Sequence, residues 1–328
     1  MSDGAALFRG PGALEQWVAS RHRKALRRLP SGVLTPGYDD GEVQRFIRAF
    51  NSESGAEDYA ARHATVQLRG KLSALLRSAA VTPVTGATVL DLGTGSGSTI
   101  APIFEVLAHS RIVATDLSPF LLEILLQRNA GERLCAVQES AEELDFLPES
   151  FDCVVGNAVL HHLFRPDRAL QRVADVLKPG GAALFFEPCE NGKVLAKLAV
   201  DSLMGDARFA TLDPGLQHWM RRFTANMSQR WKHRASERPE IYQNKDDKWI
   251  FTRSYFLQEA VSRHFSRIHV EATEKSRRAI SNNIKSKFRQ QRITPPEWVI
   301  QALDAFEDQF SPEFLLDNPQ ALSIALVK

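Results

Sequence analysis

The chain has 328 residues, 44% of them hydrophobic and 24% charged, and this balance excludes a disordered or low-complexity protein. The formal net charge is only +2, so the chain as a whole is not a polycation adapted to nucleic acid. No secretory signal pattern opens the sequence, and no apolar run reaches the roughly 20 residues of a membrane span. We therefore expect a cytoplasmic protein without a transmembrane segment.

The cysteines predict neither a disulfide framework nor a metal site. They are odd in number and lack the close spacing of metal-binding cysteines. Two of the three lie inside apolar, strand-like runs, which favours reduced and buried thiols: Cys135, Cys153 and Cys189. We expect no metal in the functional site.

The first quarter of the chain has the pattern of helices. Helical stretches are predicted over 14–28, 40–52 and 56–80, with Pro and Gly between the first two. In the third stretch, leucines recur at the spacing of one helix face: Leu68, Leu72, Leu75 and Leu76. Residues 1–80 are therefore predicted to form a helical N-terminal cap.

From residue 81 onward, strand-like and helical patterns alternate. Apolar runs of strand length occur at 87–92, 111–115, 134–137, 153–159 and 182–186, and helical patterns at 98–109, 118–129 and 166–177. Such alternation is typical of βαβ units in a doubly wound parallel sheet. We predict an α/β fold with a mostly parallel, seven-stranded, Rossmann-like sheet, and residues 81–190 as its ligand-binding core.

After this core, two insertions are predicted to interrupt the sheet. Residues 191–250 form a helical lid insertion, and 251–274 return to the core as a helix and the sixth strand. A second insertion covers 275–318, and 319–328 supply the seventh strand. The insertions and the N-terminal helices would together build a lid over one edge of the sheet.

The segment Ala87–Ile100 combines a buried strand, a glycine-rich turn and a helix start. Such a turn lets backbone approach a ligand closely, while free N–H groups and the helix dipole face it. The dinucleotide pattern G-x-G-x-x-G does not fit, because the third glycine comes one residue early, at Gly97. A phosphate-binding P-loop is excluded because no G-K-[ST] follows.

The segment Asp91–Gly97 (DLGTGSG) resembles the first motif of class I S-adenosylmethionine-dependent methyltransferases. Arg111–Ser118 is similar to the family's second strand, Glu139–Phe146 to its third segment, and Phe151–Leu163 to its fourth. The helix and turn over 169–181 resemble a part shared by the family's small-molecule enzymes, which include those of ubiquinone and menaquinone biosynthesis and of natural products.

The resemblance implies S-adenosyl-L-methionine as the cofactor. It implies that Asp116 holds both ribose hydroxyls, an arrangement that a carboxylate at a strand end also favours on physical grounds. The family commonly has an acidic residue at the position of Ser140, so the adenine contact here is open, and Glu139 lies one position earlier. The cofactor-binding residues implied are Asp91, Gly93, Thr94, Gly95, Gly97, Asp116, Leu117, Ser140, Ala141, Asn157 and Tyr59.

The methyl group of this cofactor is already electrophilic, so a general base is needed only if the acceptor must lose a proton. His161 and His162 follow the fourth core strand, and Glu187 ends the fifth, at the sheet edge where ligands bind. These three are the candidate catalytic residues. The alternatives are that the histidines pack under the lid or cap a helix, and that Glu187 orders a loop.

We therefore expect a methyltransferase that acts on a small, anionic or lipid-like biosynthetic intermediate. Nucleic acid is not the expected partner, and a homodimer is left open. One alternative is methylation of RNA or protein by the basic face over 221–292, which holds 18 Lys/Arg against 7 Asp/Glu. The other is a cyclase or binding protein that holds the cofactor without methylating.

Overall fold

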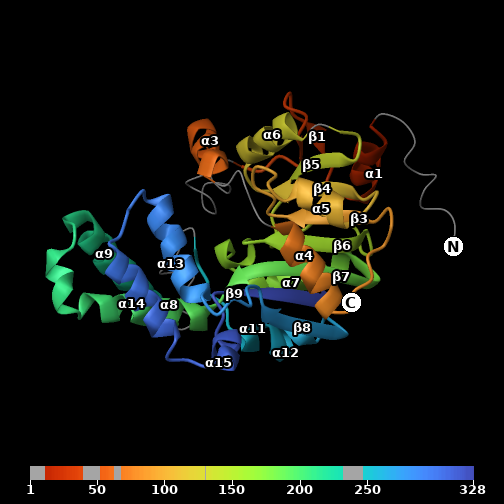
Figure 1. Ribbon diagram of the computed structural model, residues 1–328. Helices are drawn as coiled ribbons and strands as arrows, with labels where there is room; N and C mark the ends of the chain where they lie inside the picture. Colours follow the sequence, from red (N-terminus) through yellow and green to blue (C-terminus); the bar gives the residue numbers. More distant parts are fainter. Residues whose placement is uncertain (1–11, 40–51, 63–67, 130, 232–246) are drawn as a thin grey trace.

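The computed structural model describes residues 12–39, 52–62, 68–129, 131–231 and 247–328. Its centre is a twisted sheet with helices on both faces, and a helical lobe lies beyond one end of the strands (Figure 1). The strands are β1 (Arg27–Arg28), β2 (Leu34–Thr35), β3 (Thr88–Leu92), β4 (Arg111–Asp116), β5 (Leu134–Gln138), β6 (Phe151–Asn157), β7 (Leu177–Pro188), β8 (Arg267–Ala272) and β9 (Ala321–Val327).

The sheet order is β1-β2-β5-β4-β3-β6-β7-β9-β8. Strands β3 to β7 pair in parallel with their neighbours, whereas β9 pairs antiparallel with both β7 and β8. The predicted α/β class with a doubly wound, mostly parallel sheet is confirmed. The predicted number of seven strands is wrong, because the sheet has nine.

The two additional strands come from the N-terminal segment that was predicted to be wholly helical. Helix α1 (Ala13–Arg21) ends well before residue 28, and the chain continues into β1 and β2. β2 pairs in parallel with β5 and extends the sheet by a short hairpin. The helical prediction over 40–52 lies outside the described residues. In place of the third predicted helix, the structure has α3 (Glu53–Arg62) and α4 (Leu68–Ser78). Residues 63–67, between these two helices, also lie outside the described residues.

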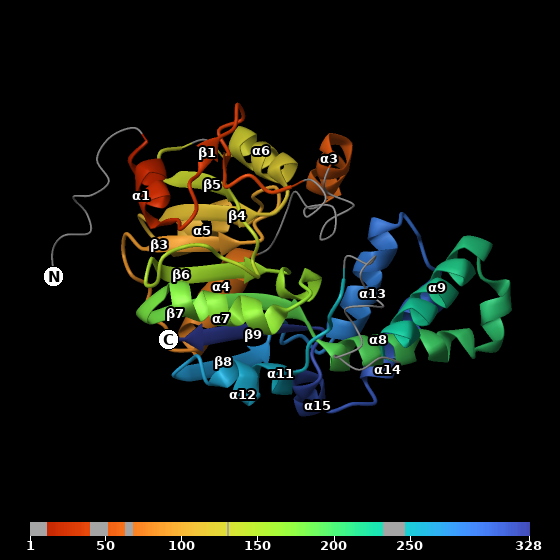
Figure 2. The same cartoon turned by 180° about the vertical axis from the view of Figure 1, so that it is seen from behind.

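Each face of the sheet carries its own layer of helices. One face is covered by α4 with α5 (Ile100–Val106) and α6 (Pro119–Arg128). The other, seen in Figure 2, is covered by α1, α7 (Pro166–Val176), α11 (Arg253–Leu257) and α12 (Glu259–Ser262). All five residues of β3 are buried between these layers, as the apolar sequence of a central parallel strand requires.

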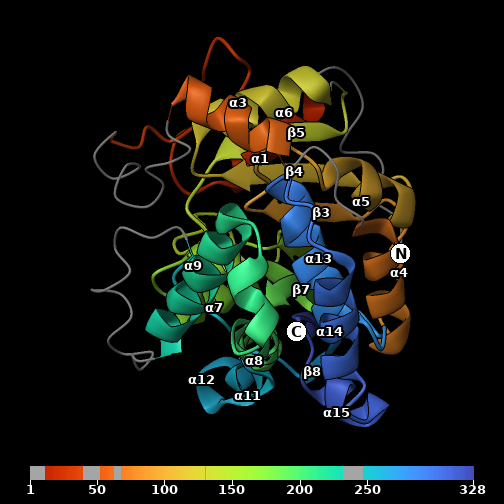
Figure 3. The same ribbon diagram turned by 60° about the vertical axis from the view of Figure 1, so that its left-hand side comes forward.

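Both insertions pack together into one helical lobe next to the carboxyl ends of the parallel strands, which Figure 3 brings to the front. The lobe contains α8 (Glu190–Met204), the 3₁₀ helix η2 (Ala207–Thr211), α9 (Pro214–Trp231), α13 (Ala279–Gln290), α14 (Glu297–Glu307) and α15 (Pro312–Asp317). It has a hydrophobic core of its own, separate from the two cores beside the sheet. Among its fully buried residues are Ile284, Val299 and Met220.

The three cysteines are free and buried, as the sequence predicts. Within the described ranges, none of the helices combines the length and the apolar character of a membrane span.

Candidate functional site

The glycine-rich turn after β3 is organised around the buried carboxylate of Asp91. Its Oδ2 accepts hydrogen bonds from the hydroxyl of Thr94, at 2.5 Å, and from that of Thr99. Burial, opposed by these two hydroxyls, raises the pKa of Asp91 to about 6. Among the described residues its Oδ1 has no hydrogen-bond partner. Asp91 thus lies beneath the turn and, through its bond with Thr99, ties the turn to the start of α5. The sequence analysis did not identify this role of Thr99.

Two glycines allow the turn to approach its neighbours closely. A Cβ on Gly93 would lie 2.3 Å from Cγ2 of Val159, so no larger residue fits beside the turn after β6. Gly95 has a φ of 57°, and a Cβ there would lie 3.3 Å from the ring of Tyr59. Tyr59, from α3, therefore lies directly over the glycine turn.

Asp116 ends β4 at the open side of the same turn. Its Oδ2 accepts the Gly95 N–H at 2.9 Å, and its Oδ1 accepts the Ser118 N–H at 2.9 Å. Burial raises the pKa of this carboxyl group. The N–H of Leu117 also interacts with this carboxylate. The side chain lines the cleft described below, where a ligand can donate hydrogen bonds to it.

A cleft of about 830 Å³, counted to its open mouth, follows the carboxyl ends of β3, β4, β5 and β6. We call it the glycine-loop cleft. Seven residues of its lining were expected from the sequence: Tyr59, Gly93, Gly95, Asp116, Leu117, Ser140 and Ala141. Five were not: Leu121, Glu142, Ala158, Val159 and Leu163. The lining also contains His162, a candidate catalytic residue, and Glu139, which was named beside Ser140 for the open adenine contact.

The other expected cofactor residues lie outside the lining of this cleft. Thr94 is buried and bonded to Asp91. A Cβ on Gly97 would meet Leu125 of α6 at 2.8 Å, so this glycine serves the contact between turn and helix. Asn157 lines a second cavity, described below.

Glu139 is placed by residues from the distant N-terminal segment. His22 Nε2 lies 2.6 Å from its Oε2, and the hydroxyl of Tyr38 donates to its Oε1 at 2.7 Å. Burial alone would lower the pKa of His22, but the hydrogen bonds to Glu139 and to the Lys24 carbonyl raise it above 6.5. No sequence motif marks these partners, because they are more than a hundred residues away from Glu139.

Glu187 orders the turn after β6 and the 3₁₀ helix η1 (Leu160–His162) that follows it. Its Oε1 accepts the N–H groups of Val159 and Leu160, at 2.9 and 2.7 Å. Its Oε2 lies 2.7 Å from His161 Nδ1. The turn holds Ala158 at a φ of 60°, a left-handed conformation that alanine rarely adopts. These bonds support the alternative that Glu187 orders a loop.

His161 lies between two carboxylates. Nδ1 faces Glu187, and Nε2 lies 3.5 Å from Oδ1 of Asp247. Burial on its own would lower the pKa of His161, but the charges and hydrogen bonds of these two carboxylates raise it to about 9. The ring is thus protonated at neutral pH and is unsuited to accept a proton.

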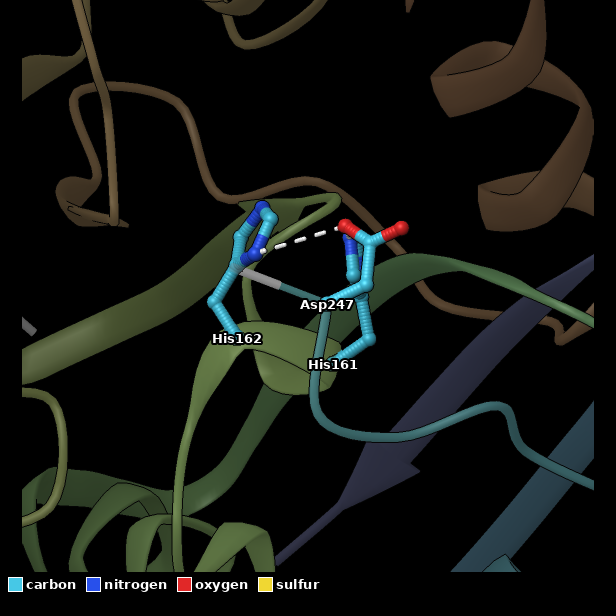
Figure 4. Close-up of side chains that lie close together, drawn as sticks. All are labelled: His161, His162 and Asp247. Atoms are coloured by element: carbon cyan, nitrogen blue, oxygen red, sulfur yellow. Dashed lines mark ion pairs between the residues drawn. The ribbon is translucent and has the colours of Figure 1, made fainter. Parts of the chain in front are cut away.

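The neighbouring His162 lines the glycine-loop cleft and has a half-buried side chain. Its Nδ1 lies 3.8 Å from the same oxygen of Asp247, and the two imidazole rings are 4.0 Å apart. Figure 4 shows the three side chains turned toward one another. Asp247 was not a candidate in the sequence analysis, because it follows the first insertion and carries no local signal.

The second cavity lies between the ends of the sheet strands and the helical lobe, and we call it the interlobe cavity. It measures about 1880 Å³ to its open mouth. Ala158 belongs to the linings of both cavities, so the turn after β6 is the wall between them. Its polar lining includes three lysines, four amides and three carboxylates: Lys71, Lys193, Lys287, Asn157, Asn226, Asn283, Gln320, Glu187, Asp247 and Glu274.

Comparison with known proteins agrees with this geometry. Residues 90–185 match a family model described as a methyltransferase domain. The chain is 38% identical over 109 residues to a demethylmenaquinone methyltransferase of Clavibacter sepedonicus, covering 33% of this chain and 44% of that protein. It is 34% identical over 107 residues to a ubiquinone/menaquinone biosynthesis C-methyltransferase of Hahella chejuensis, covering 31% and 43%. The chain thus matches less than half the length of these relatives.

Among solved structures, the chain resembles phosphoethanolamine N-methyltransferase 2 of Haemonchus contortus in complex with S-adenosyl-L-methionine. The TM-score is 0.52 at 18% identity, with 89% of this chain and 60% of that chain covered. At this identity the likeness concerns the fold.

Proposed function

We propose that this chain, whose residues 90–185 form a class I S-adenosylmethionine-dependent methyltransferase domain, methylates a small anionic molecule held in the interlobe cavity. The observation that carries the proposal is the pair of cavities divided by one turn. A ligand in the glycine-loop cleft and a second ligand in the interlobe cavity would meet at Ala158.

The glycine-loop cleft fits the cofactor. Asp116 presents a carboxylate at the end of β4 to the cleft, which suits the hydroxyl groups of a ribose. The apolar residues Leu117, Leu121 and Leu163 line the same cleft and suit the faces of a purine. The Oδ1 of Asp91, which has no partner among the described residues, places a negative group below the turn and favours a cationic ligand above it.

The cofactor supplies an electrophilic methyl group, so the chain's main task is to align the acceptor with it. Glu187 and His161 are engaged with each other and with the turn, and we assign them the positioning of that turn. Of the three candidate catalytic residues, only His162 lines the glycine-loop cleft.

The lysines of the interlobe cavity favour an anionic acceptor. Lys193 of α8 and Lys287 of α13 approach the cavity from the two insertions. Ammonium groups bind carboxylate or phosphate oxygens, and such charge-assisted bonds discriminate strongly against neutral molecules. The finer proposal is therefore a carboxylated or phosphorylated intermediate.

The test is transfer of label from methyl-labelled S-adenosylmethionine to separated acceptor pools: anionic metabolites, neutral lipids, RNA and protein. We expect label in the anionic metabolites. The double variant Lys193→Ala/Lys287→Ala should raise KM by about 100-fold or more, since each charged hydrogen bond contributes about 1.5–3 kcal/mol, which is roughly tenfold or more per bond.

The matched control for this double variant is Lys275→Ala. This lysine is paired with Glu271 on the surface and lies outside the interlobe cavity, so its removal should leave KM unchanged. Label in RNA or protein would contradict the proposed acceptor. No label in any pool, with cofactor binding intact, would contradict methyl transfer itself.

A further inference from the structure

Two adjacent histidines and one aspartate from a distant part of the chain bring their donor atoms together beside the turn after β6 (Figure 4). His161, His162 and Asp247 each offer one nitrogen or oxygen atom, and these atoms lie within 4.8 Å of one another. Two imidazoles and one carboxylate are a donor set found around divalent transition metals. Bonds of about 2.0–2.2 Å to one ion would place such atoms roughly 3–4 Å apart. The pairs to Asp247 measure 3.5 and 3.8 Å.

The hydrogen bond behind His161 orients its ring for this purpose. Nδ1 lies 2.7 Å from Oε2 of Glu187, and a carboxylate there takes the N–H of the ring. The other nitrogen, Nε2, faces Oδ1 of Asp247, and in the metal-free ring the proton on Nε2 lies between these two atoms, where a metal ion would replace it. A positive charge between them satisfies both, and a metal ion held by His–carboxylate pairs is one such charge.

The backbone holds the three donors in place. The N–H groups of Lys248 and Trp249 donate to the carbonyl oxygen of His161, at 2.7 and 3.0 Å. This fixes the residues that follow Asp247 to the 3₁₀ helix that carries both histidines. Glu187 fixes the same helix from below, through the N–H groups of Val159 and Leu160. Hydrogen bonds to the backbone therefore fix the two segments that carry the cluster relative to each other.

The cluster lies in the wall between the two cavities. His162 lines the glycine-loop cleft, whereas His161 and Asp247 line the interlobe cavity. We propose that His161, His162 and Asp247 bind one divalent transition-metal ion, and that its remaining coordination positions take an anionic oxygen of the acceptor. The ion would hold the acceptor beside the cofactor, together with the lysines of the interlobe cavity. The role of the ion in holding the acceptor rests on the proposed function, whereas the binding of the ion to these three side chains does not.

The test measures metal binding without cofactor or acceptor. Protein freed of metal with a chelator is titrated with Co²⁺, followed by visible absorption and calorimetry, and then with Zn²⁺ as a competitor. We expect one equivalent of Co²⁺, a d–d absorption band, and its displacement by Zn²⁺. Asp247→Asn and His162→Ala should each weaken binding more than about 100-fold, because disturbing a partner behind a ligand already costs about 10- to 100-fold.

The matched control is His269→Ala, which removes a histidine near Glu271 on β8, outside both cavities. Its affinity for Co²⁺ should equal that of the unchanged chain. Asp247→Asn keeps the size of a half-exposed side chain, so it tests the ligand without emptying the core.

Two results would overturn the proposal: no stoichiometric binding of Co²⁺ or Zn²⁺, or equal binding by the variants and the control. Binding of S-adenosylmethionine is measured on the same samples, so that a failure of metal binding can be distinguished from a failure of the proposed function. Loss of metal binding with cofactor binding and methyl transfer intact would contradict only the role of the ion.

Discussion

Asp116 is the residue on which the cofactor assignment depends most directly. Its two oxygens already accept the N–H groups of Gly95 and Ser118, and the side chain lines the cleft. Asp116→Asn keeps the size of the side chain but replaces one acceptor by a donor. We expect the affinity for S-adenosylmethionine, measured by calorimetry, to fall about 10- to 100-fold, because bonds to a charged group contribute about 1.5–3 kcal/mol.

The control for this variant is Asp175→Asn, which removes only an exposed ion pair with Arg172. It should bind the cofactor as the unchanged chain does. If Asp116→Asn retained full affinity while folding normally, the carboxylate would not hold the ribose.

At the residue scale, sequence reasoning found what local motifs carry. Gly93, Gly95, Asp116 and Ala141 all follow directly after strands, and the structure places them in one cleft. His22 and Tyr38 could not be found in this way. They meet Glu139 only because the N-terminal segment adds β2 to the sheet beside β5, a contact that depends on the completed fold.

At the element scale, the N-terminal segment shows why helical periodicity alone was insufficient. The stretch over 14–28 has helical spacing, but its last two residues form β1 and complete an edge of the sheet. Hydrogen bonds to neighbouring strands, which the sequence does not display, outweighed its local preference. The central strands were easier to predict because each is a short, mainly apolar run.

The pair of His22 and Glu139 attaches this segment to the cleft, and it makes stability depend on pH. The pKa of His22 is raised in the folded protein, although burial opposes this, because Glu139, the Lys24 carbonyl and Asp145 favour the charged ring. Its contribution is therefore complete below about pH 6.5 and is lost as the pH rises through the raised value.

We expect His22→Gln to lower the free energy of unfolding by about 2 kcal/mol at pH 6, the size of a hydrogen bond to a charged group. Above the raised pKa the difference from the unchanged chain should shrink. Urea titrations from pH 5.5 to 9.5 measure this. A difference that stayed constant over the range would show that the His22 charge contributes nothing.

At the scale of the whole molecule, two units with separate cores divide the work. The sheet and its helices form the glycine-loop cleft, and the lobe built from both insertions forms one side of the interlobe cavity. The first unit could be recognised from the sequence because its motifs follow one another in order. The lobe could only be outlined, because its helices come from two insertions whose contacts are long-range and carry no motif.

This division predicts that damage to the lobe spares the cofactor site. Phe288 of α13 is 1% exposed and packs against Trp219 with ring centroids 4.7 Å apart. Phe288→Ala should destabilise the lobe by about 3–5 kcal/mol through the cavity that it leaves. In calorimetric melting we expect a separate, earlier transition, with methyl transfer lost but affinity for S-adenosylmethionine kept within about twofold.

The matched variant is Phe185→Ala, which empties a fully buried position of β7 in the sheet core. A Cβ on Gly156 would touch the Phe185 ring at 2.5 Å, so this ring supports the strand that leads into the turn after β6. Phe185→Ala should therefore weaken cofactor binding as well as stability. If Phe288→Ala reduced cofactor affinity to the same extent, the two cores would unfold as one, and the lobe would support the cofactor site as well as the acceptor cavity.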